Sequence, residues 1–159
     1  MEQNKTNQVL LQSLNNKISF NNIDVNLKLN KIKKLRAWLN VVIHNENKNL
    51  EVISYNFCSD KRLNKINNKY LNHDDYTDII TFDLSDGGDI FADIYISTER
   101  IKENSLKHKT SYKTELMRVM VHGVLHLCGY KDKSQNEEKI MRGKEDFYLS
   151  LWEEFPVST

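Results

Sequence analysis

The residues most suited to chemistry are two histidines four positions apart, His122 and His126, in a stretch that is otherwise apolar. On an α-helix this spacing places both imidazoles on one face, about 6 Å apart along the axis. Two imidazoles so placed can bind one ion together. The alternative is a pair of core histidines bonded to the backbone or to each other, but each buried imidazole would then need polar partners of its own. A shared metal ion satisfies both, and the spacing therefore predicts a metal site.

A third ligand is expected just beyond the histidines. Gly129 follows them, and glycine is the usual residue in the left-handed conformation that ends a helix. The chain can reverse there, and Asp132 is the first group after the turn that could reach the ion. A carboxylate is an accepted zinc ligand, although an exposed loop aspartate is the alternative. We predict one zinc ion per chain, held by His122, His126 and Asp132.

Three protein ligands leave a fourth position for water, as in catalytic rather than structural zinc sites. Such a water can ionise near neutral pH and attack an ester. In zinc peptidases with the His-Glu-x-x-His motif, a glutamate follows the first histidine and acts as the general base. Gly123 occupies that position here, and no glutamate lies between the two histidines. A metallopeptidase is therefore the weaker alternative.

The histidines belong to a predicted helix that begins near Ser111 or Tyr112 and ends at Gly129. This helix is apolar on nearly every side, which is typical of a central, buried helix. Its apolar residues are Leu116, Met117, Val119, Met120, Val121, Val124, Leu125 and Leu127.

Apolar periodicity and turn residues predict the other elements. Strands are expected over 18–20, 50–58, 78–83 and 89–97, and the turn at 85–88 joins the last two as a hairpin. Helices are expected over 31–45, 60–69 (with Ser59 as N-cap), 98–107 and 136–154. The last helix is expected to turn Ile140, Phe147 and Leu151 inward. Together these elements predict an α+β fold, a small mixed sheet of about four strands with helices packed on it.

Bulk properties limit the class of protein. The chain has 159 residues, 39% of them apolar and 28% charged, which suits one globular domain over 1–159, with residues 1–16 loosely held. The net charge of +1 is too small to attract nucleic acid or membranes to the protein as a whole, so any RNA contact must come from a local patch of positive charge. Two cysteines, Cys58 and Cys128, predict buried thiols rather than a disulfide framework. The chain has neither a signal-like apolar segment at its start nor a run of 18 apolar residues, so we expect a cytoplasmic protein.

The sequence around the histidines resembles the signature of the YbeY family, bacterial endoribonucleases also called rRNA maturation factors. That signature reads His-Gly-x-Leu-His-Leu-x-Gly-Tyr-Asp-His. Seven of its fixed positions are met, by His122, Gly123, Leu125, His126, Leu127, Gly129 and Tyr130. The stretch 67–82, with Tyr70, Asp74 and Thr77-Asp78-Ile79-Ile80-Thr81-Phe82, is similar to the family's Tyr-Arg-x-x-Asp-x-Pro-Thr-Asp-Val-Leu-Ser-Phe segment. The stretch 92–97 is similar to its Gly-Asp-Ile-x-Ile-Ser strand, and the resemblance extends from about residue 35 to the end.

The resemblance implies a small α+β fold and a zinc-dependent endoribonuclease specific for single-stranded RNA. It implies a role in rRNA processing, especially maturation of the 3′ end of 16S rRNA, and in ribosome quality control. The implied partners are ribosomal RNA and the small ribosomal subunit, with neither DNA nor membrane.

Two positions depart from the family pattern. Asp132 stands where the family has its third histidine, and Leu71 stands where an arginine follows the tyrosine. A guanidinium at position 71 would suit RNA phosphate, so Arg118, Lys131 and Lys133 are the candidate RNA contacts instead. Loss of the arginine leaves open a non-catalytic, zinc-containing ribosome assembly factor. The sequence assigns no residue to acid–base catalysis, and it does not choose between attack by water and attack by the RNA 2′-hydroxyl.

Overall fold

The computed structural model describes residues 3–5, 17–71 and 77–155. Its strands form one four-stranded sheet in the order β1-β2-β4-β3. These strands are β1 (Ile18–Asn22), β2 (Leu50–Cys58), β3 (Ile79–Asp83) and β4 (Ile90–Ser97). β1 and β4 both run parallel to β2, whereas β3 runs antiparallel to β4 and forms an edge of the sheet. The predicted mixed sheet and the predicted β3–β4 hairpin are confirmed.

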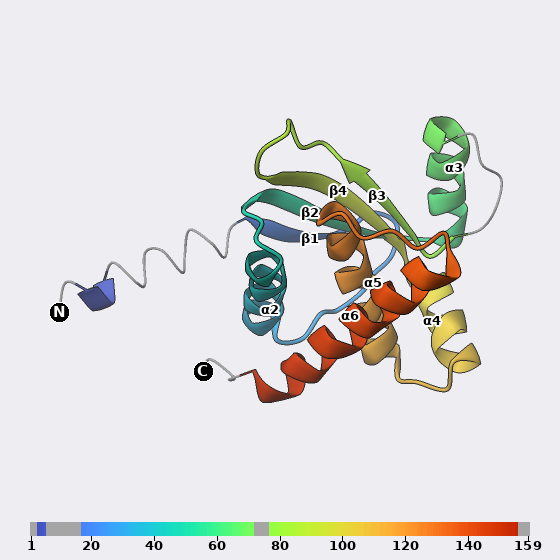
Figure 1. The fold of residues 1–159 in the computed structure, drawn as a ribbon. Coiled ribbons are helices and arrows are strands. Elements are labelled where there is room, and N and C mark those ends of the chain that lie inside the picture. The colour runs from blue at the N-terminus through green and yellow to red at the C-terminus, as the bar shows by residue number, and fades with distance from the viewer. Residues whose placement is uncertain (1–2, 6–16, 72–76, 156–159) are drawn as a thin grey trace.

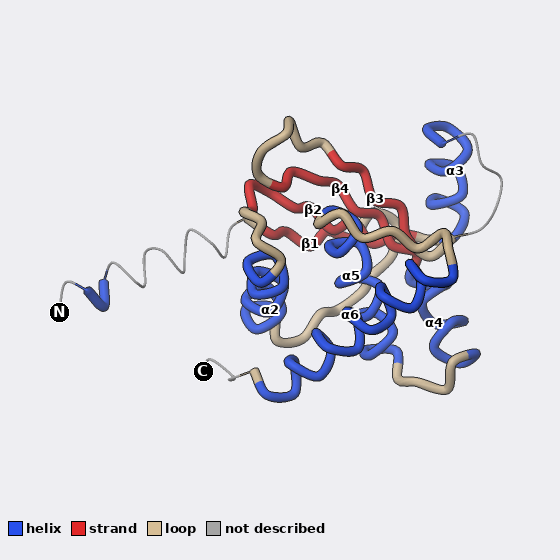
Figure 2. The backbone as a smooth tube through the Cα atoms, in the orientation of Figure 1, coloured by secondary structure: helices blue, strands red, loops and turns tan. Residues whose placement is uncertain are grey.

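Helices lie on both sides of this sheet. They are α2 (Ile32–Asn45), α3 (Asp60–Leu71), α4 (Thr98–Lys107), α5 (Tyr112–Leu127) and α6 (Gln135–Glu154). The sheet forms the upper layer in Figure 1, with α2, α5 and α6 beneath it and α3 at the right. Figure 2 shows the same division, with the strands in red above most of the blue helices. The α+β fold is confirmed. Within the described ranges, no helix is long and apolar enough to cross a membrane.

Serine side chains mark where helices begin. Ser97 accepts a hydrogen bond from the backbone N–H of Arg100, and Ser111 accepts one from Thr114. Ser134 and Glu137 form a reciprocal capping box at the start of α6. These caps satisfy N–H groups that have no partner inside a helix, and they fix the start of each helix close to its predicted position.

The helix α5 is the centre of the core, as its composition predicts. Its buried side chains contact the sheet, and the Tyr55 hydroxyl of β2 donates a hydrogen bond to the Met120 carbonyl at 2.9 Å. Gly123 lies close to the sheet. A Cβ atom there would lie 2.9 Å from Cδ1 of Ile79 and 3.2 Å from Oγ1 of Thr81. The absence of a side chain at Gly123 therefore lets α5 pack directly against β3.

The predicted inner face of the last helix is wrong at two of its three residues. Ile140 and Phe147 are 47% and 51% exposed, whereas Leu151 is half-buried and packs against the core. The buried residues of α6 are Met141, Glu145, Tyr148 and Trp152. Two of these carry polar groups with partners inside the protein, so a pattern of apolar residues alone points to the wrong side of the helix.

Both cysteines are free thiols, as expected, although Cys58 is buried and Cys128 only half-buried. Burial raises the pKa of Cys58 to about 12 and that of Cys128 to about 11. Both thiols are therefore protonated near neutral pH and are poor nucleophiles. The expectation of a loosely held segment over 1–16 falls outside the described residues except at 3–5 and so stays untested.

Candidate metal centre

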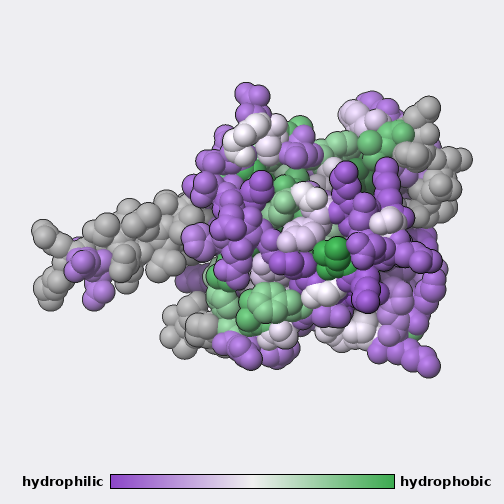
Figure 3. All heavy atoms as spheres, viewed as in Figure 1, coloured by the Kyte–Doolittle hydropathy of each residue, from purple (hydrophilic) through white to green (hydrophobic). Residues whose placement is uncertain are grey.

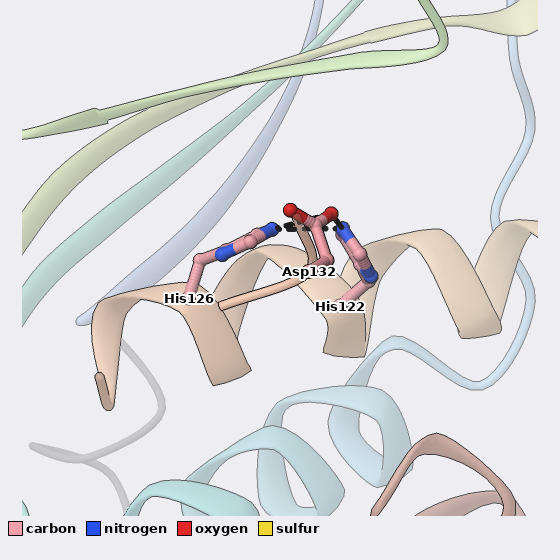
Figure 4. A group of neighbouring side chains, drawn as sticks. All are labelled: His122, His126 and Asp132. Atoms are coloured by element: carbon pink, nitrogen blue, oxygen red, sulfur yellow. Dashed lines mark hydrogen bonds and ion pairs between the residues drawn. The ribbon is translucent and has the colours of Figure 1, made fainter. Parts of the chain in front are cut away.

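The three predicted ligands come together at one point. The rings of His122 and His126 project from α5 toward Asp132, which lies on the loop that follows that helix (Figure 4). The Nε2 atoms of the two histidines are 2.9 Å apart. Oδ2 of Asp132 lies 3.3 Å from Nε2 of His122 and 3.2 Å from Nε2 of His126. One ligand atom from each residue lies within 4.8 Å of the others, so a single ion could contact all three.

The loop reaches this position through the turn predicted at Gly129. Its φ of +104° lies in the region that favours glycine, and the Tyr130 N–H then donates to the Leu125 carbonyl at 3.1 Å. The Tyr130 hydroxyl donates to Glu46, at the end of α2, at 2.7 Å. The loop that carries Asp132 is thus fixed to the helices at two points.

Both imidazoles are oriented by acceptors at their other nitrogen. Nδ1 of His122 lies 2.8 Å from Oε2 of Glu145, and Nδ1 of His126 lies 2.8 Å from the Tyr130 carbonyl oxygen. Because these groups accept hydrogen bonds, each Nδ1 carries a proton, so in a neutral ring Nε2 presents its lone pair to an ion. Two lone pairs and the Asp132 carboxylate then face one another, and this set of acceptors fits a cation.

The charges around His122 also favour a cation. Burial would raise the pKa of Glu145, but hydrogen bonds from His122 and Arg118 hold it below the usual range, so Glu145 is a carboxylate. Burial would lower the pKa of His122, but Glu145, Asp132 and Asp78 together raise it. Positive charge is therefore stabilised at this position, and either a proton or a metal ion can supply it.

A cleft of about 390 Å³ opens beside the ligands and is bordered by His122 and Asp132. Arg118 and Arg142 bring cations to its wall, and Glu115, Glu138, Glu145 and Asp78 bring carboxyl groups. Burial raises the pKa of Asp78. A substrate could approach the ligands through this cleft.

The candidate RNA contacts lie around the same place. Arg118 lines the cleft, and its guanidinium already pairs with Glu145 at 3.0 Å and Asp146 at 2.7 Å. Lys131 and Lys133 are exposed on the loop that carries the third ligand. The structure thus places two of the three cations in solvent and the third in a network of ion pairs.

Sequence reasoning missed Glu145, the residue that orients His122. A signal existed, since Glu145 follows Met141 by four positions and precedes Tyr148 by three, which is the spacing of a helix face. The role of the Tyr130 carbonyl had no signal, because a backbone oxygen is present at every position. Leu71, where the family has arginine, is the last residue of α3 and is 44% exposed. Asp74, quoted in the resemblance, lies outside the described residues.

Comparisons with known proteins bear on the family and the fold of the chain. A family model described as endoribonuclease YbeY matches residues 15–153. A protein named endoribonuclease YbeY from Flavobacterium psychrophilum is 49% identical over 135 residues, which are 85% of this chain and 96% of that protein. A protein of the same name from Christiangramia forsetii is 48% identical over 78% of this chain and 87% of its own length. The solution structure of a Thermotoga maritima protein shares the fold, with a TM-score of 0.62 and 23% identity over 88% of this chain and 94% of that one.

Proposed function

Because the chain belongs to the YbeY family of endoribonucleases, we propose that it cleaves single-stranded RNA at a zinc ion held by His122, His126 and Asp132. The observation that carries this assignment is the convergence of three acceptor atoms, two of them on imidazoles whose Nδ1 atoms are already bound. One domain over residues 1–159 supplies the whole site.

The biological substrate in this proposal is ribosomal RNA, and the partner is the small ribosomal subunit. The resemblance supports maturation of the 3′ end of 16S rRNA and ribosome quality control as the processes served. Work on this RNA would place the protein in the cytoplasm.

The chain's own residues prepare the site for a divalent ion. Glu145 and the Tyr130 carbonyl hold the imidazoles in the ligating orientation, and Asp132 contributes one negative charge. A divalent ion bound there would supply a Lewis acid beside the scissile phosphodiester. Imidazole and carboxylate ligands suit zinc, which is the metal of this proposal.

Three cationic side chains near the metal ligands are the candidates for phosphate contacts. Lys131 and Lys133 flank Asp132 on the loop, and Arg118 stands in the wall of the cleft. We assign phosphate contacts to these side chains, because Leu71 offers no guanidinium at the family position.

The geometry at Gly123 weakens the peptidase alternative. A glutamate there would bring its Cβ to 2.9 Å from Cδ1 of Ile79, so the end of that side chain would have to shift. The position of the peptidase base therefore holds no carboxylate, and the packing against β3 disfavours a side chain there.

The test is cleavage of an unstructured RNA by the zinc-loaded protein. We expect cleavage that a chelator stops and that zinc restores, and the His122→Ala variant purified in parallel should be inactive. If the wild-type protein cleaves the RNA no faster than the His122→Ala variant, the proposal is contradicted and the non-catalytic assembly factor is favoured. End-group analysis then identifies the attacking group, because 2′-hydroxyl attack leaves a cyclic phosphate whereas attack by water does not.

A further inference from the structure

A second hollow lies between α3 and the sheet, away from the metal ligands. It holds about 740 Å³ and is lined by α3, by the outward side chains of β3 and β4, and by Ile23 and Leu84. Apolar surface is visible beside α3 at the upper right of Figure 3. We call this hollow the α3 groove.

The α3 groove and the metal centre lie on opposite faces of the edge strand β3. Ile79 and Thr81 point toward Gly123 of α5, on the side of the metal ligands. Ile80 and Phe82 alternate with them and belong to a separate cluster with Leu63 and Ile66 of α3. Since successive side chains of a strand point to opposite faces, β3 divides the two surfaces and touches both.

Three aromatic rings form a continuous row in the α3 groove. The centroid of Phe82 lies 5.8 Å from that of Tyr70 and 5.9 Å from that of Tyr95, and both pairs meet edge to face. Tyr70 is 62% exposed, and Leu84 beside the row is 46% exposed. Phe82 and Tyr95 are half-buried and support Tyr70, whose exposed ring offers a surface on which a flat ring of a ligand can stack.

The wall of the α3 groove is cationic. Arg62, Lys65 and Lys69 line it from α3, three and four positions apart and therefore on one face of the helix. Asp93 is the carboxylate in the same lining. The chain as a whole carries a net charge of +1, so this concentration of positive charge is local.

We propose that the α3 groove binds a single-stranded segment of the RNA substrate, with bases on the aromatic row and phosphates along Arg62, Lys65 and Lys69. Aromatic side chains beside a positively charged groove are the combination by which proteins hold single-stranded nucleic acid. A duplex would keep its base faces stacked internally, and an acidic peptide would use the cations but not the rings. The inference rests on the proposed function, because it extends the same RNA from the metal centre around the edge strand β3.

The direct test is photocrosslinking of RNA that contains 4-thiouridine to the zinc-loaded protein, followed by mass spectrometry of the peptides. An unstructured RNA of about 12 nucleotides, within the range of known single-strand sites, should crosslink to the α3 groove. Crosslinks confined to the cleft beside His122 would overturn the inference.

Affinity gives a second readout, through fluorescence anisotropy recorded within seconds of mixing with the same RNA. Tyr70→Ala removes an exposed ring and should raise the Kd about tenfold, within the range that one stacked base contributes. The Lys65→Glu, Lys69→Glu double variant should raise the Kd by at least as much. It should also reduce the slope of log Kd against log salt by about 0.7 for each lost phosphate contact.

The matched control is the Lys28→Glu, Lys33→Glu double variant, which makes the same change of charge at exposed positions outside the α3 groove. An equal loss of affinity in this control would overturn the inference, because net charge alone would explain the binding. Displacement of the RNA by polyglutamate, with no effect of Tyr70→Ala, would overturn it in favour of a protein partner.

The outcomes separate the two proposals. Crosslinks in the α3 groove without any cleavage would contradict the proposed function but support RNA binding in the groove. Cleavage by the wild-type protein with an unchanged Kd in the groove variants would support the proposed function but contradict RNA binding in the groove.

Discussion

Nδ1 of His122 lies 2.8 Å from Oε2 of Glu145, so a residue of the metal centre on α5 is oriented by a buried carboxylate on α6. Glu145 also accepts a hydrogen bond from Arg118 at 3.0 Å. The orientation of His122 therefore depends on how α6 packs against α5, and not only on the helix that His122 shares with His126.

The Glu145→Gln variant should bind zinc about 10- to 100-fold more weakly than wild type, the range found for residues that orient metal ligands. The amide keeps the shape of the side chain but removes the charge that favours a cation at His122. Competition with a fluorescent chelator measures this affinity. Asp146→Asn is the matched control, because Asp146 also pairs with Arg118 but is 59% exposed and does not contact His122. Equal zinc affinity in Glu145→Gln and wild type would remove Glu145 from the site.

Asp132 gives the sharpest test of the ligand set. Asp132→Ala should weaken zinc binding about as much as His126→Ala, because each removes one of three ligands. Asp132→His should retain the metal through three imidazoles, and Asp132→Asn should fall between, since a neutral amide is a poorer zinc ligand. The same chelator competition separates these variants. If Asp132→Ala binds zinc as tightly as wild type, another group completes the site.

Glu46 should make stability depend on pH. Burial would raise its pKa, but hydrogen bonds from Tyr148, Tyr130 and Lys144 lower it below the ordinary value of 4.5. A carboxyl group with a lowered pKa stabilises the folded state above its unfolded pKa, and this contribution is lost as pH falls through the folded pKa. Urea unfolding near pH 7 should show Glu46→Gln to be less stable by about 1–3 kcal/mol, the cost of disrupting a buried charged hydrogen-bond network.

The difference between Glu46→Gln and wild type should shrink as the pH is lowered below 4.5, because the wild-type carboxylate then becomes protonated. A difference that stays constant across this range would mean that Glu46 stabilises the fold by packing rather than by charge.

A methyl group should be less favourable at Gly123 than at Gly143. Gly123→Ala places a Cβ 2.9 Å from Cδ1 of Ile79, and shifting that side chain should cost about 1–3 kcal/mol, which opposes the gain of about 1 kcal/mol in helix propensity. Gly143→Ala on α6 is the control, because nothing lies within 4 Å of a Cβ there. Alanine favours the helical state over glycine by about 1 kcal/mol, so the control should be more stable than wild type. Urea unfolding should therefore show Gly123→Ala to be less stable than Gly143→Ala, and equal stability of the two variants would contradict the close packing at Gly123.

The part of the site that is local in sequence could be predicted. Two histidines one helical turn apart and a glycine that reverses the chain fix the relation of Asp132 to His126 within seven residues. The contribution of α6 could not be predicted in the same way. Its buried face includes Glu145 and Tyr148, whose polar atoms are stabilised by partners on other elements, and apolar periodicity assigned Ile140 and Phe147 to that face instead. A buried charge can be recognised only once its partners are placed in space.

Tyr130 joins two hydrogen-bond systems, since its carbonyl accepts from His126 while its hydroxyl donates to Glu46 at the end of α2. An ion that binds only when the 129–134 loop is ordered also favours every contact made by that loop. Local unfolding at the carboxyl end of α2 should therefore depend on the zinc concentration, although the zinc ligands lie on α5 and on the loop that follows it. Amide protons there should exchange more slowly with deuterium as zinc is added, although no residue of α2 contacts the ion.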